Sequence, residues 1–313
     1  MPTSLDRNRP LGTPSAWGML GRLWRMPVLL LIGACLFWAG NFIIGRGIGQ
    51  SVPPFFLSFW RWLLALGMLL PFAWPHLRRD AQAILRHVPL LFGLSLLGIG
   101  SFSTLVYIGL RSTPAINGLL LQSVIPLAII LCSFLLFREA PRRGQVLGLA
   151  LSAGGVVAIA SHGSVEDLLA LRLHPGDLWV LAAVLSYAVY SACLRLRPAI
   201  HPLSFLAASI ALALVAIGAG AIWEAGHSAA PPVTATLLLA IFYLALFPSL
   251  LAYLFFNRGV ELIGANRAGQ FIHLLPLFGS LMAVGLLGEA LHGFHLAGLA
   301  LIGAGILLAM RGR

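Results

Sequence analysis

Residues 138–151 read REAPRRGQVLGLAL, and residues 288–301 read GEALHGFHLAGLAL. The two stretches are 150 positions apart, and at this offset residues 115–155 match residues 265–305 without a gap. Matched Leu and Ala are common in apolar sequence, but shared Pro, Glu and Gly positions are not. These pairs are Pro126 with Pro276, Glu139 with Glu289, Gly148 with Gly298 and Gly155 with Gly305. Self-similarity at a fixed offset indicates a duplicated structural unit.

The chain around these stretches is too apolar for a soluble fold. Of its 313 residues, 59% are hydrophobic and only 9% are charged, and the mean hydropathy is +0.95. Soluble domains carry roughly 25% charged residues. The sequence therefore predicts an all-α membrane protein whose apolar surface contacts the lipid bilayer.

The net charge of +11 does not indicate a nucleic-acid partner. All 20 basic residues are Arg, and they lie between apolar runs rather than in one patch. Basic residues in this distribution are typical of the cytoplasmic ends of membrane helices. The three cysteines, Cys35, Cys132 and Cys193, lie far apart in apolar runs. They predict neither a disulfide nor a metal site, and no cofactor is expected.

Ten apolar runs are long enough to cross a bilayer, which takes about 20 residues in a helix. Pro, Gly or charged residues interrupt the chain between them. The ten predicted spans are residues 28–46, 54–74, 88–110, 115–137, 144–161, 177–195, 202–222, 235–257, 266–287 and 293–310.

The Arg residues predict the orientation of these spans. With the N-terminus in the cytoplasm, 16 Arg fall on the cytoplasmic side, three on the outer side and one, Arg61, inside a span. Cytoplasmic loops retain positive charge, so both termini are expected to be cytoplasmic. The apolar run after Pro27 exceeds the 7–15 residues of a signal-peptide core. We therefore expect residues 1–26 to form a cytoplasmic tail and the first span to be retained.

The ten spans divide into two halves of five. We expect one repeat at 27–162, an outer linker at 163–175 and a second repeat at 176–311. Because five is odd, the second half enters the membrane from the side opposite to the first. Inverted repeats around a central cavity are a signature of carriers that work by alternating access. A duplication without transport is the structural alternative.

A set of aromatic, charged, Pro and Gly positions recurs in a recognisable order: Phe37-Trp38-Ala39-Gly40-Asn41-Phe42 followed by Arg46, then Arg61, Pro126, Arg138-Glu139-Ala140 and Gly148, and in the second half Pro276, Glu289-Ala290 and Gly298. On these residues each half resembles a repeat of the EamA-type transporters of the drug/metabolite transporter superfamily. The resemblance covers nearly all of 27–311. It departs where Tyr187 stands near the Trp38 equivalent and where the second half has no intramembrane Arg that corresponds to Arg61. It implies a ten-helix carrier of the bacterial inner membrane that exports small metabolites, often amino acids. It does not identify the substrate.

Polar and aromatic residues inside the spans are the candidate substrate ligands, because such groups at bilayer depth need partners or a water-filled cavity. Several share one face of a helix. Gln122, Gln270 and His273 each precede a repeat-matched proline by about one turn, where a carbonyl is left unpaired. The structural alternative is that these groups bond their own helices or fill space. The candidates are Trp38, Asn41, Tyr107, Gln122, Tyr187, Tyr190, Ser249, Tyr253, Gln270 and His273. Together they predict a neutral pocket for an amino acid.

Arg61 is a charge within a span, and burying it costs roughly 2.5–3.5 kcal/mol on insertion scales. A ligand for a substrate carboxylate and a cap for helix carbonyls are both compatible with this position. Pro126, Pro276, Glu139 and Glu289 are expected to have structural or hinge roles. Glu139 and Glu289 end their helices, where the dipole disfavours an anion, so hydrogen bonds from the next helix are expected to compensate.

Other functions find less support. The nine acidic residues lie in the tail, loops or helix ends, so a carboxylate proton relay is not expected and efflux is predicted to be downhill or weakly coupled. A membrane-embedded enzyme would need paired Asp clusters, a Lys or an H-E-x-x-H motif, and the sequence has none. A drug or nucleotide-sugar carrier and a channel remain as alternatives. The expected partners are the small-molecule substrate and the bilayer, and a monomer is compatible with the sequence.

Overall fold

The computed structural model describes residues 23–49, 51–113, 115–161, 164, 166, 174–287 and 293–311. Most of these residues are helical, in ten segments joined by short connections. Several helices have Pro in their first turn, at Pro54, Pro126, Pro175 and Pro202. Proline is favoured there because its fixed φ suits the helix and its missing N–H is not needed.

Five helical segments form the N-terminal half. The third segment contains a π-helical stretch, and the fourth is broken by a turn at Ser123 and Val124. The segments are α2 (Pro27–Gly49), α3 (Pro54–Arg86), α4 (Val88–Ser95) with η1 (Leu96–Ser101) and α5 (Phe102–Leu110), α6 (Ala115–Gln122) with α7 (Ile125–Phe137), and α8 (Arg143–Ala160).

The C-terminal half repeats this order. Its third segment also contains a π-helical stretch, and its fourth is also broken, here by a short 3-10 turn. The segments are α10 (Pro175–Cys193) with η2 (Leu194–Leu196), α11 (Pro202–Ala225), α12 (Ala235–Leu244) with η3 (Ala245–Leu251) and α13 (Ala252–Ile263), α14 (Ala265–Gln270) with η4 (Phe271–His273) and α15 (Leu274–Leu287), and α16 (Gly293–Arg311).

Seven of the described helical segments are long and apolar enough to cross a membrane. They correspond to the first four predicted spans and to the sixth, seventh and eighth. The fifth and tenth predicted spans correspond to two shorter apolar helices, Arg143–Ile159 and Leu296–Arg311. Helix α3 differs from the prediction because it runs to Arg86 instead of ending near residue 74, with Pro71 and Pro75 inside it.

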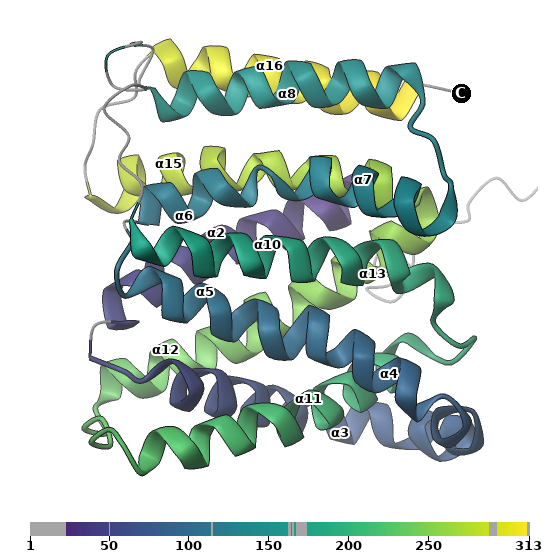
Figure 1. Ribbon diagram of the computed structural model, residues 1–313, viewed down its shortest axis with the longest axis vertical. Coiled ribbons are helices and arrows are strands. Elements are labelled where there is room, and N and C mark those ends of the chain that lie inside the picture. The colour runs from purple at the N-terminus through teal and green to yellow at the C-terminus, as the bar shows by residue number, and fades with distance from the viewer. Residues whose placement is uncertain are drawn as a thin grey trace, which may run out of the picture.

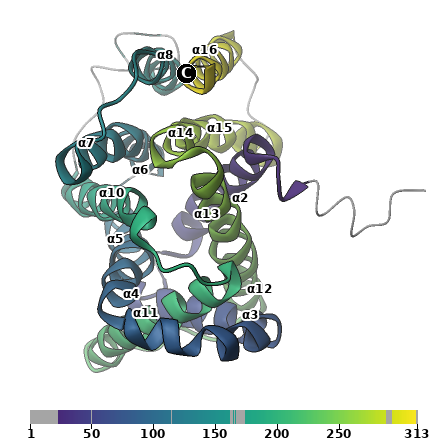
Figure 2. The ribbon, with the colours of Figure 1, turned by 90° about the vertical axis from the view of Figure 1, so that its right-hand side faces the viewer.

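The two halves pack through equivalent contacts. In the N-terminal half α2 contacts α13 and α15, and in the C-terminal half the corresponding α10 contacts α5 and α7. Helix α3 packs on α11 at one end of the molecule, and α8 packs on α16 at the other (Figure 1). The remaining helices lie between these two pairs, as the view from the side also shows (Figure 2).

Glycines bring α8 and α16 into backbone contact. A Cβ at Gly148 would lie 2.4 Å from the carbonyl oxygen of Gly305, and a Cβ at Gly155 would lie 2.8 Å from that of Gly298. Gly148, near the start of α8, meets Gly305 near the end of α16, and Gly155 meets the earlier Gly298, so the two helices are antiparallel. Helices approach this closely only where small residues meet.

Candidate functional site

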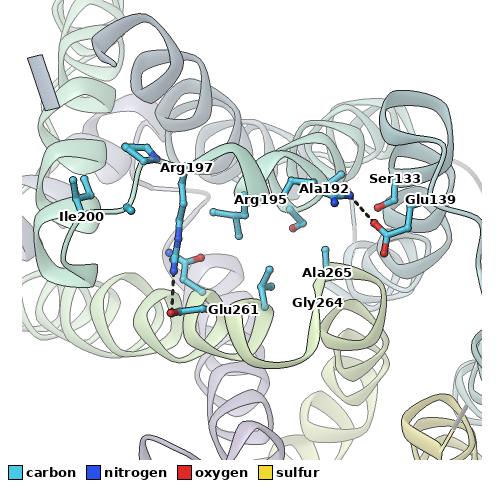
Figure 3. Close-up of a pocket in the computed structure, with 15 residues that line it drawn as sticks. Ser133, Glu139, Ala192, Arg195, Arg197, Ile200, Glu261, Gly264 and Ala265 are labelled. Carbon is cyan, nitrogen blue, oxygen red and sulfur yellow. Dashed lines mark hydrogen bonds and ion pairs between the residues drawn. The ribbon is translucent and has the colours of Figure 1, made fainter. Parts of the chain in front are cut away.

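A cavity of about 620 Å³ is lined by residues at the C-terminal ends of α7, α10 and α13. We call it the vestibule (Figure 3). Its walls come from both halves of the chain. The lining residues are Ser133, Glu139, Ser191, Ala192, Leu194, Arg195, Arg197, Pro198, Ala199, Ile200, Asn257, Val260, Glu261, Gly264 and Ala265.

Ion pairs neutralise the acidic groups of the vestibule wall. Arg195 Nη1 lies 2.9 Å from Glu139 Oε2, and Arg197 Nη2 lies 2.9 Å from Glu261 Oε2. Arg258 Nη1 lies 3.0 Å from the other carboxylate oxygen of Glu261. Three guanidinium groups thus face two carboxylates, which leaves an excess of positive charge beside the opening.

A hydrogen bond between α10 and α13, both of the C-terminal half, lies at the inner end of the vestibule. Tyr190 on α10 donates from its hydroxyl to Asn257 Oδ1 on α13, at 3.0 Å. Ser191 and Asn257 line the vestibule, whereas Tyr190 is only 2% exposed. This bond marks the boundary between the open cavity and the packed interior.

A cluster of aromatic rings lies directly behind this boundary. We call it the aromatic layer. Neighbouring ring centroids are 4.6 to 6.5 Å apart, within the range of favourable aromatic contacts. The rings belong to Trp38, Trp62, Phe102, Tyr187, Tyr190, Tyr253 and Phe256. They come from α2, α3, α5, α10 and α13, so both halves contribute.

Gln122 lies at the edge of the aromatic layer. It lines a small cavity of about 10 Å³ with Trp38, Phe102 and Tyr187. Both of its side-chain polar atoms are buried and have no hydrogen-bond partner among the described residues. An unsatisfied buried amide is costly, so Gln122 is available to a polar group that enters the layer.

The aromatic layer is tied to the two π-helical stretches. Trp38 Nε1 donates to the carbonyl oxygen of Pro248 in η3 at 3.1 Å. At the corresponding place in the other half, Ser186 Oγ donates to the carbonyl of Leu97 in η1 at 2.8 Å. Tyr253 also donates to the carbonyl of Gly98. In each half the first helix therefore binds the π-helical stretch of the other half, and such stretches are frequent at functional sites.

A second polar cluster surrounds Arg61, which is 3% exposed. Its Nε and Nη2 donate to the same acceptor, Ser249 Oγ, at 3.0 and 2.8 Å. Its Nη1 donates to Asn41 Oδ1 at 2.9 Å and to the Tyr107 hydroxyl. That hydroxyl donates in turn to Asn41 Oδ1 at 2.8 Å. We call these four residues the Arg61 cluster.

Gln270 and His273 lie apart from both clusters. His273 Nδ1 is 2.6 Å from Ser152 Oγ on α8, and its Nε2 is 2.9 Å from the Ser123 carbonyl in the α6–α7 turn. Gln270 Nε2 donates to the Gln145 carbonyl on α8 at 2.9 Å. These side chains join the broken fourth segments to α8.

The residues with predicted structural roles lie at helix breaks and ends. Pro126 lies in the first turn of α7, and Pro276 lies within α15. Glu139 accepts a hydrogen bond from Arg195 Nη1 at 2.9 Å. Glu289 lies outside the described residues.

Sequence reasoning did not select every residue of the vestibule. Asn257 follows Ser249 and Tyr253 at intervals of four, so its helix face was visible in the sequence. Arg197 and Glu261 carried no comparable signal, because charged residues near helix ends are common. Among the described residues, no group of three His, Cys, Asp or Glu side chains is placed to hold a metal ion.

Two packed helical halves with a vestibule between them define a membrane transporter, and comparison with known proteins identifies the family. The EamA-like transporter family matches residues 25–161 and again residues 174–311. The chain belongs to this family, so it is a multi-pass membrane transporter and not an enzyme. The family resemblance seen in the sequence is thereby confirmed.

The chain is similar over most of its length to several curated transporters. It is 24% identical to the uncharacterized transporter YyaM of Bacillus subtilis strain 168, over 90% of this chain and 92% of that one. It is 27% identical to a probable amino-acid metabolite efflux pump of Salmonella typhimurium strain LT2, over 88% and 91%. It is 25% identical to the uncharacterized inner membrane transporter YedA of Escherichia coli strain K12, over 90% of each.

A solved crystal structure shows the same fold. Its TM-score is 0.72 at 20% sequence identity, and the match covers 90% of this chain and 96% of the other. At this level of identity the likeness concerns the fold alone.

Proposed function

We propose that the protein is an inner-membrane carrier that exports small metabolites, in the first place neutral or aromatic amino acids, by alternating access. The observation that carries this proposal is the vestibule that ends on an aromatic layer built by both halves. A one-sided cavity closed at its inner end is what one state of an alternating carrier requires. The Salmonella relative is named a probable amino-acid metabolite efflux pump, which favours the same substrate class.

The two repeats, 27–162 and 176–311, form inverted halves in this proposal, with residues 163–175 as the linker between them. The reciprocal contacts Gly148–Gly305 and Gly155–Gly298 support it. At the offset of 150, Gly148 corresponds to Gly298 and Gly305 corresponds to Gly155, so the two contacts are equivalent when the halves are exchanged. This is the relationship expected for a twofold axis between antiparallel helices. If these helices span the bilayer, that axis lies in the membrane plane.

The vestibule faces the cytoplasm in this proposal. The Arg side chains at its mouth lie in connections for which the charge bias predicts a cytoplasmic position. Both chain ends and the tail at 1–26 would then be cytoplasmic as well. On this proposal, the state described here accepts cargo from inside the cell.

We assign substrate contact to the residues at and behind the vestibule boundary. Trp38, Tyr187, Tyr190 and Tyr253 provide apolar faces with polar edges, and Gln122 provides an unpaired amide. Asn41, Tyr107 and Ser249 act through the Arg61 cluster. Gln270 and His273 do not contact the cargo in this proposal; their hydrogen bonds to α8 position α15 against that helix.

Counterflow in liposomes tests the function. Purified protein is reconstituted, the vesicles are loaded with one unlabelled compound at a time, and uptake of the labelled compound is followed. The panel contains amino acids, nucleotide sugars and cationic drugs. Saturable counterflow of amino acids that needs no imposed proton gradient is the expected result. Counterflow restricted to nucleotide sugars or drugs would favour that class of carrier, and unsaturable flux would favour a channel.

A further inference from the structure

Arg61 is a buried cation without an acidic partner among the described residues. Its hydrogen-bond acceptors are two hydroxyls and one amide oxygen, and its guanidinium also lies over the rings of Trp62 and Tyr107, at 5.1 and 5.6 Å. The buried acidic residues of the described chain, Asp177 and Glu224, accept hydrogen bonds elsewhere. A charge held only by neutral groups at this depth favours binding of an anion.

The geometry around the guanidinium indicates which anion fits. Its Nε and Nη2 form the edge that binds both oxygens of a carboxylate in side-by-side hydrogen bonds. Here both nitrogens donate to one hydroxyl oxygen, Ser249 Oγ. Ser249 itself donates to the Leu244 carbonyl at 2.7 Å. One weak acceptor thus occupies an edge that suits two strong ones.

The Arg61 cluster lies on the line that leads inward from the vestibule. Asn257 and Tyr253 are four residues apart on α13, about 6 Å along the helix. Ser249 precedes Tyr253 by four more residues, in η3. Asn257 borders the vestibule, Tyr253 belongs to the aromatic layer, and Ser249 binds Arg61. A cargo that passes the aromatic layer along this line therefore meets Arg61.

Charge along this line has one sign. The carboxylates of Glu139 and Glu261 at the vestibule are held in ion pairs with Arg. Neither the aromatic layer nor the Arg61 cluster contains an acidic residue. An amine thus finds no unpaired carboxylate among the described residues of this line, whereas an anion finds positive charge at its start and at its end.

We infer that Arg61 binds the carboxylate of the cargo and thereby makes the carrier selective for small organic carboxylates. The inference rests on the proposed carrier function and sharpens its substrate class: the carboxylate is the required group, and the α-amino group is not. The carboxylate displaces Ser249 from the Nε and Nη2 edge of Arg61 when the aromatic layer opens.

Matched compounds that differ in one group test this inference on the purified, full-length protein. One series is L-leucine, 4-methylpentanoate without the amine, leucinamide, and 3-methylbutylamine without the carboxylate. The second series is L-phenylalanine, 3-phenylpropionate, phenylalaninamide and 2-phenylethylamine. Binding is measured as the ligand-dependent rise in the thermal unfolding midpoint. In at least one series, both carboxylates are expected to bind at least about tenfold more tightly than the amide and the amine, since loss of a partner from a buried charge pair has at least this effect.

Three variants connect the preference to the guanidinium. Arg61→Gln is expected to remove the difference between carboxylate and amide, and Arg61→Lys to retain part of it. Ser249→Ala removes the competing acceptor and is expected to raise carboxylate affinity, which a purely structural role of Ser249 would not do. Arg86→Gln, an exposed position at the end of the same helix, is the control and is expected to bind as the unmodified protein does.

The outcomes separate this inference from the proposed function. If amides or amines bind as tightly as the acids, or if Arg61→Gln keeps the preference, the inference is wrong. It is also wrong if no carboxylate of either series binds while other compounds show counterflow, and the carrier function then stands. If Arg61→Gln does not fold, unchanged or weaker carboxylate affinity in Ser249→Ala overturns the inference. Absence of all counterflow removes the proposed function and the inference with it.

Discussion

Gly148 of α8 touches the backbone of Gly305 of α16, so that a Cβ on Gly148 would lie 2.4 Å from the Gly305 carbonyl oxygen. At the repeat offset of 150, the counterpart of Gly148 is Gly298 and that of Gly305 is Gly155. Those counterparts also touch, with a Cβ on Gly298 lying 3.0 Å from the Gly155 carbonyl oxygen. Gly148 thus contacts Gly305, and their repeat counterparts Gly298 and Gly155 contact each other across the same pair of helices. The two contacts are therefore equivalent under exchange of the two halves.

Substitution of Gly148 by Ala is expected to destabilise the protein. The new methyl group would collide with the backbone of α16, and overpacking of this kind costs about 1–3 kcal/mol. The apparent midpoint of thermal unfolding in detergent measures the effect. Gly154→Ala on the same helix is the matched control, because no atom lies within 4 Å of a Cβ there. Equal midpoints for the two variants would show that α8 and α16 leave room for a methyl group at Gly148.

Trp38→Phe keeps an aromatic ring in the layer but removes the N–H that binds the Pro248 carbonyl. A hydrogen bond of this kind contributes about 1 kcal/mol, and its loss leaves η3 held to α2 by packing contacts such as Phe37 with Phe247. We expect a lower initial rate of counterflow, with a smaller effect on the unfolding midpoint. Trp179→Phe, which changes a half-exposed ring on α10, should leave the rate unchanged. A normal rate in Trp38→Phe would exclude a transport role for this bond.

Gln122→Ala and His273→Ala are expected to separate transport from stability. Gln122 has no hydrogen-bond partner among the described residues, so its removal should weaken cargo binding with little change in the unfolding midpoint. His273 binds Ser152 and the Ser123 carbonyl. Its removal should therefore lower the free energy of unfolding by about 1–3 kcal/mol and lower the unfolding midpoint accordingly. Counterflow affinity and thermal unfolding are measured on both variants. If instead His273→Ala weakened cargo binding and Gln122→Ala lowered the unfolding midpoint, His273 would be assigned to the cargo pocket and Gln122 to a structural role.

Glu224→Gln should destabilise the protein more than Glu139→Gln. Glu224 is 8% exposed and accepts a hydrogen bond from the Phe56 amide at 2.8 Å, in the first turn of α3. Loss of an anionic cap costs about 1 kcal/mol or more. Glu139 pairs with Arg195 at a half-exposed site, where an ion pair contributes at most about 1 kcal/mol. Unfolding midpoints compare the two, and a larger loss in Glu139→Gln would contradict the assignment.

Stability is expected to decrease on acidification because of His201. Partial burial and the stacked ring of His76 lower the pKa of His201 below its ordinary value of 6.5, against the opposing effect of Asp80. The neutral ring also accepts a hydrogen bond from the Leu203 amide at 3.3 Å. A lowered pKa means that the unfolded chain binds more protons, so the contribution is present above pH 6.5 and is lost below it.

Unfolding midpoints at pH 7.5 and pH 5.5 measure this effect. His201→Gln should show a smaller decrease between the two pH values than the unmodified protein. His227→Gln, which alters an exposed His in another connection, should show the full decrease. An equal decrease in all three proteins would assign the pH dependence to other groups.

Helix positions were largely predictable from the sequence. A bilayer requires continuous apolar helices, so hydropathy alone located the segments from Pro27 to Arg311. The extension of α3 to Arg86 was not predictable in this way, because residues beyond the apolar run form helix by packing and capping contacts. One such contact is the hydrogen bond from the His201 amide to Asp80. The π-helical stretches at η1 and η3 were also missed, since no regular spacing marks them.

The candidate site was predictable only in part. Spacing of three and four placed Trp38 with Asn41 and Ser249 with Tyr253 on common faces, and the structure brings these residues to two adjoining clusters. The same reasoning grouped Gln270 and His273 with them through their position before Pro276. In the structure these two side chains face α8 instead. A spacing rule gives the residues that share a face but not the neighbour that the face meets.

The sequence by itself determined the class of protein, the helical segments and the duplication, because composition, hydropathy and self-similarity are properties of residue order. It also indicated that Arg61 lies within a span. Only the tertiary structure decided that Arg61 binds Ser249, 188 positions away, and that a vestibule opens beside Asn257. The physical reason is that the rotation of each helix about its axis depends on packing against all its neighbours at once. That packing joins residues from both halves and has no local signature.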